Sequence, residues 1–176
     1  SSELLVRLNP LHKNTQDEVN RAIKLGADLL MLPMFQSAEE LNIFSSMVAK
    51  RVGVIPLVET ASALKDIHRI VKVPGVSEIY IGLNDLHLDM GLNFMFEPLA
   101  NGVIDDACEV IRKAKLPFGI GGIARIGEGV IPAELVLAEH VRLGSSSVIL
   151  SRSFHQSYHE IISFKKNMNL KKEIDR

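Results

Sequence analysis

Residues 52–85 read VGVIPLVETASALKDIHRIVKVPGVSEIYIGLND, and this stretch contains two short, almost continuously apolar runs that each end in polar residues. Strands covered on both faces have this composition, whereas strands with one wet face alternate apolar and polar residues. Similar runs begin near positions 4, 27, 116 and 147, so the six runs are spaced by 23, 25, 25, 39 and 31 residues. This spacing predicts a repeated strand–helix unit and a parallel sheet wrapped by helices.

The segments between the runs carry signals for helix starts and stops. Thr15 with Glu18, and Ser37 with Glu40, each fit a capping box, in which a hydroxyl and a carboxylate bond the free amides of the first turn. Gly26 stands where the first helix should end. The sequence therefore predicts a helix after each of the first two strands.

Two α/β architectures fit such units, a doubly wound sheet and an eight-stranded barrel. A doubly wound nucleotide-binding sheet should have a glycine-rich turn after its first strand, and residues 7–15, RLNPLHKNT, contain no glycine. A whole barrel takes about 250 residues, so a chain of 176 residues with a strand-like start at Leu4 is short at its front. We predict one partial TIM-type (β/α)8 barrel domain over 1–176, with the first two units missing and 155–176 as a C-terminal helical tail.

Composition narrows the class of protein. With 47% hydrophobic residues and a net charge of -1, the chain can bury a large core and has no cationic field for nucleic acid or an anionic membrane. A single cysteine gives no disulfide framework and suits a reducing cytoplasm. No apolar run reaches the roughly 18 residues of a membrane span. We expect a cytoplasmic protein whose partner is a small molecule, with no nucleic acid and no membrane.

Polar residues end several of the predicted strands, and the carboxyl ends of barrel strands face one shared pocket. Glu59 and Asp85 end neighbouring runs, so both carboxylates could reach one hard cation such as Mg²⁺. The alternative is that each acid only sits in the first turn of the next helix. Arg7 and Asn9 end the first run, and Asn9 is a further candidate for binding the substrate. A charged arginine inside an apolar strand needs a function or a structural partner, for which Glu59 and Asp28 are the candidates.

The strings around these residues resemble the signature of the metal-dependent HpcH/HpaI aldolase and citrate lyase beta-subunit family. They are VETASAL at 58–64, IGLNDL at 81–86 followed by Met90-Gly91, VRLN at 6–9 and MLP at 31–33. The resemblance implies a TIM-type barrel with a divalent metal, Mg²⁺ or Mn²⁺, that binds a pyruvate-like keto acid or its enolate. It makes Glu59 and Asp85 the metal ligands, the Asn84 and Asp85 amides the holders of the substrate carboxylate, and Arg7 the group that stabilises enolate charge.

The chain departs from the family pattern in three places. Leu57 stands where many aldolases have a glutamine that contacts the keto acid, and Asn84 stands where a small residue is usual. The histidine that aldolase members use as general base comes from an early strand, which would precede Ser1. The first hypothesis is a class II aldolase or carbon–carbon lyase, expected as a homo-oligomer. The alternatives are a lyase for an acyl-CoA ester of the malyl, citramalyl or citryl type, and a non-catalytic anion-binding barrel subunit.

Three further candidates each have a structural alternative. Residues 118–129 contain five glycines, and the amides of Gly121 and Gly122 with Arg125 could hold a phosphate or carboxylate of the substrate, or simply form a tight turn. His87 could be an acid or base at the pocket mouth, or could cap a loop. His140 could act near the last strand, although a hydrogen-bonded structural histidine is the more common case.

Overall fold

The computed structural model describes residues 2–154, 162–163 and 166. The helical tail predicted at 155–176 therefore lies outside the described residues, apart from three positions.

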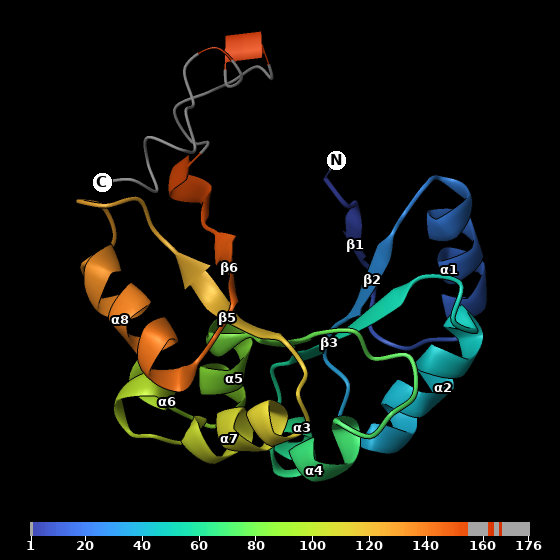
Figure 1. Cartoon of the computed structure of the whole chain (residues 1–176), viewed down its shortest axis with the longest axis horizontal. Helices are drawn as coiled ribbons and strands as arrows, with labels where there is room; N and C mark the ends of the chain where they lie inside the picture. The colour runs from blue at the N-terminus through green and yellow to red at the C-terminus, as the bar shows by residue number, and fades with distance from the viewer. Residues whose placement is uncertain (1, 155–161, 164–165, 167–176) are drawn as a thin grey trace.

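In the described part of the chain, six parallel strands form one sheet, and each strand pairs with its neighbours in chain order. The strands are β1 (Leu5–Arg7), β2 (Leu29–Leu32), β3 (Gly53–Val58), β4 (Ile79–Ile81), β5 (Phe118–Ile123) and β6 (Ser147–Leu150). The sheet is curled, with the helices on its convex side (Figure 1). Because the strand order never reverses, the sheet has no switch point of the doubly wound type. The predicted parallel order is confirmed, and the fold is consistent with part of a TIM-type barrel.

The helices follow the strands as the repeat predicts, with extra turns after β3 and β4. They are α1 (Thr15–Lys24), α2 (Ala38–Val48), α3 (Ala61–Lys65), α4 (Ile67–Ile70), α5 (Leu83–Asp89), α6 (Glu97–Ala100), α7 (Asp105–Lys113) and α8 (Ala133–Leu143), and a 3₁₀ turn, η1 (Arg152–Phe154), follows β6. None of the helices in the described part of the chain has the length and apolar character needed to cross a lipid bilayer.

The helix-start signals are only partly right. Ser37 is the N-cap of α2, and its hydroxyl accepts from the Glu40 amide, as predicted. The capping box at Thr15 is wrong, because Thr15 is already inside α1 and Asn14 is the N-cap. The Thr15 hydroxyl instead accepts from the backbone amide of His12.

Both faces of the sheet are buried, which explains the continuous apolar runs. On the helix side, side chains such as Leu30, Val58 and Ile79 belong to the large core between strands and helices. On the concave side a second cluster consists of Met31, Ile55, Leu57 and Tyr80, with the partly buried Leu29 against it. Alternate residues of each strand therefore enter opposite cores, and residues such as Glu59 that continue the inward series face the inside of the curl.

The two outer strands of the sheet are β1 and β6, and each leaves one side unpaired within the described residues. Their apolar residues are unusually exposed: Leu5 by 40%, Ile149 by 46% and Leu150 by 42%, and Leu4, just before β1, by 50%. The strand that carries Arg7 thus lies at an open edge of the sheet.

Candidate metal and substrate site

Glu59 lies directly after β3, at the carboxyl end of the sheet, and is only 3% exposed. The inward series of β3 runs through Ile55 and Leu57, both in the concave cluster, and Glu59 is next in that series. A carboxylate in such an apolar setting must be hydrogen-bonded, paired or protonated. Glu59 therefore needs a hydrogen-bond donor, a positive charge or a proton at this position.

The backbone on either side fixes the Glu59 segment. Its Oε1 accepts a hydrogen bond from the backbone N–H of Met34, just beyond β2, at 2.9 Å. The next residue, Thr60, is the N-cap of α3, with its hydroxyl accepting from the Ala63 amide and donating to the carbonyl oxygen of Phe35 at 2.9 Å. Glu59 is thus tied to the end of the neighbouring strand on one side and to a capped helix on the other.

The pKa of Glu59 is raised to about 7, mainly because burial penalises its charged form. The Met34 N–H opposes this shift by stabilising the charged form. The charge of Asp85 and a side-chain hydrogen bond to Asp85 raise the pKa further, while the charge of Arg7 lowers it. These three side chains, predicted from three different strand ends, therefore interact electrostatically in the folded chain.

Asp85 and Asn84 lie in the first turn of α5, which begins directly after β4 through Gly82. Asp85 is partly buried and Asn84 is exposed. Asp85 thus occupies the helix-start position that the structural alternative predicted, and from there it also interacts with Glu59. The two hypotheses for Asp85, a first-turn acid and a metal ligand, are compatible. From the first turn of α5 its carboxylate can interact both with the positive end of the helix dipole and with Glu59.

Arg7 is the last residue of β1, opposite Met31 in the sheet register. Its side chain is exposed, and none of the ion pairs found among the described residues involves it. Asp28, the alternative partner, accepts from the Leu4 amide instead, at 2.8 Å. The interaction of Arg7 with Glu59 is the electrostatic one, in which the charge of Arg7 lowers the pKa of Glu59.

Asn9 turns toward α1 rather than toward Glu59. Its amide nitrogen donates to Oε1 of Glu18 at 2.5 Å, and His12 contacts the same oxygen at 3.2 Å. These contacts hold the loop after β1 and lower the pKa of Glu18. They also explain why Glu18 is not part of a capping box.

The glycine-rich segment is accounted for largely by packing and turns. A Cβ on Gly119 would overlap the Tyr80 ring at 2.0 Å, and one on Gly121 would lie 3.0 Å from Leu83. Gly127 and Gly129 have φ of +81° and +98°, a conformation that favours glycine. Gly122 is partly buried at a register shift between β5 and β6. Arg125, at the end of this segment, bonds Ser153 through its backbone amide at 3.0 Å and faces Glu128 at 3.7 Å.

The two candidate histidines, His87 and His140, lie in different parts of the fold. His87 is buried on α5, two residues beyond Asp85, and its Nδ1 contacts the Leu83 carbonyl at 3.3 Å. His140 is buried on α8, with Nδ1 2.9 Å from the Ser145 hydroxyl, which in turn lies 3.3 Å from the Phe118 carbonyl at the start of β5. His140 thus lies at the amino end of the strands, opposite the end that carries Glu59.

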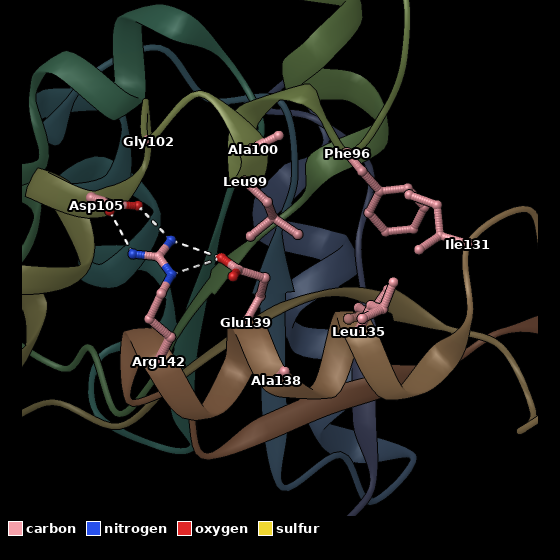
Figure 2. A pocket seen from close by; sticks show the side chains of 11 residues that line it. Phe96, Leu99, Ala100, Gly102, Asp105, Ile131, Leu135, Ala138, Glu139 and Arg142 are labelled. Atoms are coloured by element: carbon pink, nitrogen blue, oxygen red, sulfur yellow. Dashed lines mark hydrogen bonds and ion pairs between the residues drawn. The ribbon is translucent and has the colours of Figure 1, made fainter.

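A hollow of about 530 Å³ lies away from these residues, between α6, the start of α7 and α8 (Figure 2). Its apolar wall includes Phe96 and Leu135, and at its other end Arg142 bonds both Asp105, at 2.7 Å, and Glu139, at 2.8 Å. The guanidinium is thus already paired with two carboxylates. None of the predicted site residues lines this hollow.

The donor set around Glu59 suits a hard divalent cation. The described residues contain no cluster of three or more histidine, cysteine or acidic side chains that could hold a metal. Burial raises the pKa of Glu59, and the negative charge of Asp85 raises it further. A cation bound by both carboxylates would stabilise their charged forms. Magnesium sites in enzymes commonly use one or two carboxylates and leave other positions to water and substrate. The pair therefore fits a magnesium-type site.

Two residues beside Glu59 were missed by the sequence analysis. Met34 contributes a backbone amide, and nothing in its side chain marks it in the sequence. Gly82 lies where a Cβ would come 3.0 Å from Oε2 of Glu59. The string IGLND contains Gly82, but only the fold shows which side chain needs the space.

The chain belongs to the HpcH/HpaI aldolase/citrate lyase family, whose model matches residues 1–124. The 4-hydroxy-2-oxo-heptane-1,7-dioate aldolase of Klebsiella pneumoniae subsp. pneumoniae is 28% identical over 172 residues, which cover 79% of this chain and 63% of the relative. The chain therefore spans less than two thirds of the length of that curated relative. The family resemblance of the sequence motifs is confirmed.

Solved structures of the same family share the fold. One is an HpcH/HpaI aldolase/citrate lyase family protein from Burkholderia cenocepacia J2315, with a TM-score of 0.67 and 19% identity over 85% of this chain and 67% of that chain. Another is the citrate lyase beta subunit of M. tuberculosis in complex with oxaloacetate and magnesium, with a TM-score of 0.65 and 17% identity over 83% of this chain and 66% of that chain. At these identities the likeness concerns the fold.

Proposed function

We propose that this chain is part of a divalent-metal-dependent carbon–carbon lyase that breaks or forms a bond next to a pyruvate-like keto acid. The observation that carries the proposal is the buried Glu59, which interacts with Asp85 and Arg7 at the carboxyl ends of the strands. Membership of a family of aldolases and lyases supports the same class of reaction. The aldehyde-lyase chemistry of class II aldolases is the form we favour, because the curated relative is an aldolase.

Glu59 and Asp85 would hold Mg²⁺ or Mn²⁺ at this site. A bound divalent cation supplies Lewis-acid stabilisation of negative charge on the oxygens of the keto acid. The fit rests on two hard oxygen donors from neighbouring strand ends: burial raises the pKa of Glu59, and the charge of Asp85 raises it further. The magnesium bound by the M. tuberculosis citrate lyase beta subunit supports the choice of metal.

Arg7 and the start of α5 would act on the substrate itself. Cleavage of a bond next to a keto group leaves an electron pair that moves onto the keto oxygen, and the Arg7 guanidinium can donate two parallel hydrogen bonds to such an oxyanion. The Asn84 and Asp85 amides, in the first turn of α5, would hold the substrate carboxylate. We assign the general base to no residue of this chain.

Two further βα units would complete the barrel. The support is the pair of exposed strand edges: β1 and β6 each offer backbone groups and apolar side chains of the kind that another strand normally covers. Gly121, Gly122 and Arg125 would then face the acceptor half of the substrate across a closed pocket.

A second candidate, an acyl-CoA ester lyase, is favoured by Leu57. This side chain is buried in the concave cluster with Tyr80 and Met31, so it offers no polar group to a keto acid. The same metal pair would serve both reactions, and the two candidates differ in the half of the substrate that becomes the enolate, which is the keto acid in the aldolase and the acetyl thioester in the acyl-CoA ester lyase.

Metal binding and turnover test the proposal together. Calorimetry should show that the purified chain binds Mg²⁺ and Mn²⁺. Glu59→Ala and Asp85→Ala should each reduce the metal affinity at least tenfold. Asp106→Ala, an exposed acid in the first turn of α7, is the control and should bind as the wild type does. Unchanged affinity in both site variants would place the metal elsewhere and overturn the assignment.

The substrate class is tested by pyruvate release. Hydroxy-keto acids and acyl-CoA esters are offered in parallel, and pyruvate is read through coupled lactate dehydrogenase while acetyl-CoA is read by chromatography. Turnover of hydroxy-keto acids supports the aldolase, and release of acetyl-CoA from an acyl-CoA ester supports the second candidate. Binding of keto acids without turnover of either class would favour a non-catalytic barrel subunit.

A further inference from the structure

We propose that Met34 and Gly82 are positioning residues for Glu59: the Met34 amide fixes Oε1, and the missing side chain of Gly82 leaves space for Oε2 to act as the ligating oxygen. This inference rests on the proposed metal site and specifies how one of its two carboxylates is held. It assigns a role to one backbone amide and one absent Cβ, neither of which touches the substrate.

Met34 has a backbone conformation that methionine rarely adopts. Its φ is +55°, in the left-handed region that costs most side chains free energy. Among the described residues, the other non-glycine residues with positive φ are Ala49, Lys50 and Lys115, and all three lie just beyond the ends of α2 or α7. Helix ends commonly use this conformation.

Met34 has no such explanation, because it follows a strand rather than a helix. Its side chain is 41% exposed, so burial of the thioether does not enforce the backbone angle either. What the conformation does achieve is the 2.9 Å hydrogen bond from its N–H to Oε1 of Glu59. Unusual backbone conformations persist only where the surroundings stabilise them, and a bond to a buried carboxylate is a strong stabilising contact.

Gly82 constrains the other oxygen. Its backbone angles, φ of -90° and ψ of 96°, are open to any residue, so backbone freedom does not require a glycine. A Cβ at this position would lie 3.0 Å from Oε2 of Glu59, 3.1 Å from its Cβ and 3.2 Å from Cδ1 of Leu57. The glycine therefore provides room for the Glu59 side chain in the conformation that the Met34 amide selects.

The Met34 amide and Gly82 each lie beside a different oxygen of the Glu59 carboxylate. Oε1 is held by the amide on the β2 side, and Oε2 lies beside Gly82, the N-cap of the helix that carries Asp85. Oε2 is therefore the oxygen that a cation shared with Asp85 would meet. A carboxylate held in one orientation loses less conformational freedom when it binds a ligand.

Backbone conformation is tested with Met34→Val and Met34→Gly. Valine is β-branched and disfavours positive φ, so Met34→Val should move the amide away from Glu59 and weaken Mn²⁺ binding about tenfold or more in calorimetry. Glycine keeps the N–H and tolerates the angle, so Met34→Gly should bind Mn²⁺ within about twofold of the wild type. Ala49→Val, at the same φ of 55° beyond α2, is the matched control and should lower the melting temperature without changing Mn²⁺ affinity.

Space beside Oε2 is tested with Gly82→Ala, which should also weaken Mn²⁺ binding about tenfold. The control is Gly53→Ala at the opposite end of β3, where a Cβ would come 2.7 Å from Leu29 and 2.8 Å from Ser77. This control crowds the sheet at least as tightly, so it should lower the melting temperature while Mn²⁺ affinity stays unchanged. Thermal melts on every variant separate loss of the fold from loss of the site.

The outcomes distinguish this inference from the proposed function. If the wild type binds Mn²⁺ and Met34→Val and Gly82→Ala bind it equally well, the positioning roles are wrong while the metal site stands. If affinity falls in the controls as much as in the site variants, the effect is general destabilisation and the inference is overturned. If the wild type binds neither Mn²⁺ nor Mg²⁺, the proposed site fails and this inference fails with it.

Discussion

At the scale of single residues, burial of Glu59 makes it a source of instability in the metal-free protein. A buried carboxyl with a raised pKa keeps its proton in the folded state at pH values where the unfolded chain has lost it. The folded state is then destabilised as pH rises from about 4.5 to about 7, the range between the ordinary pKa and the raised one.

We therefore predict that Glu59→Gln stabilises the metal-free protein at pH 8, by up to about 3 kcal/mol, with little change at pH 4.5. Urea denaturation at the two pH values measures the difference. Added Mg²⁺ should reverse the order at pH 8, because only the wild type retains the charged ligand. Equal stability of the two proteins at pH 8 without metal would show that the Glu59 carboxyl is not desolvated.

Arg7 gives a second prediction at this scale. If its guanidinium stabilises the developing oxyanion, Arg7→Lys should keep the fold and the metal affinity but reduce kcat about a hundredfold, roughly the 3 kcal/mol of one preorganised donor. Lysine keeps the positive charge and loses the planar pair of donors. A purely structural arginine would instead lower the melting temperature and leave kcat of the folded protein unchanged.

Single residues also show where prediction from sequence reaches its limit. Glu59, Asp85 and Arg7 could be chosen because they end apolar runs whose carboxyl ends meet at one edge of the sheet, and because the strings around them resemble motifs of the family. Met34 could not, since its contribution is an amide placed by a positive φ, which side-chain identity does not reveal. His140 was chosen for its closeness in sequence to β6, and the fold puts it at the other end of the strands, because a helix runs back along its sheet before the next strand starts.

At the scale of elements, the strands were predictable and the helix ends less so. All six strands begin within about two residues of the predicted positions. In β2 to β5 the apolar run follows from burial of both faces, whereas the runs of β1 and β6 are apolar although they are exposed here. The α1 start was misread because Glu18 bonds Asn9 and His12, residues of the preceding loop, instead of the free amides of the helix. Long-range contacts of this kind compete with local capping, and the sequence does not show which will win.

Helix α8 provides the prediction that belongs to this scale. His140 anchors α8 to the starts of β5 and β6 through Ser145. Its Nε2 is buried and has no hydrogen-bond partner among the described residues, and burial lowers its pKa. The unfolded chain therefore takes up a proton below about pH 6.5 that the folded state resists, so stability should fall as the pH drops below about 6.5.

The variant His140→Gln should remove this part of the pH dependence. Urea denaturation of the wild type and the variant at pH 7.5 and pH 5.5 gives the comparison, with Glu59 present in both so that its opposite contribution cancels. Mn²⁺ affinity should not change, since the C-terminal end of α8, which carries His140, lies at the end of the strands away from Glu59. A wild type and variant with the same loss of stability at pH 5.5 would show that His140 accepts its proton without unfolding.

At the scale of the whole molecule, the sheet has two distinct kinds of strand. β3 and β4 are paired on both sides and covered on both faces, whereas β1 and β6, at the two ends of the curled sheet (Figure 1), are paired on one side within the described residues and leave Leu5 and Ile149 exposed. Local stability in a protein follows the density of buried contacts around each element. The centre of the sheet should therefore be its most stable part.

Hydrogen exchange measures this gradient directly. In the purified chain the amides of β3 and β4 should exchange slowest and those of β1 and β6 fastest, by about two orders of magnitude, because opening an outer strand breaks one ladder rather than two. Leu5→Lys should leave this order unchanged, since its side chain is already exposed. Protection of β1 and β6 equal to that of β3 would mean that a second chain pairs with the open edges, and sedimentation velocity would then detect an oligomer that Leu5→Lys together with Ile149→Lys dissociates.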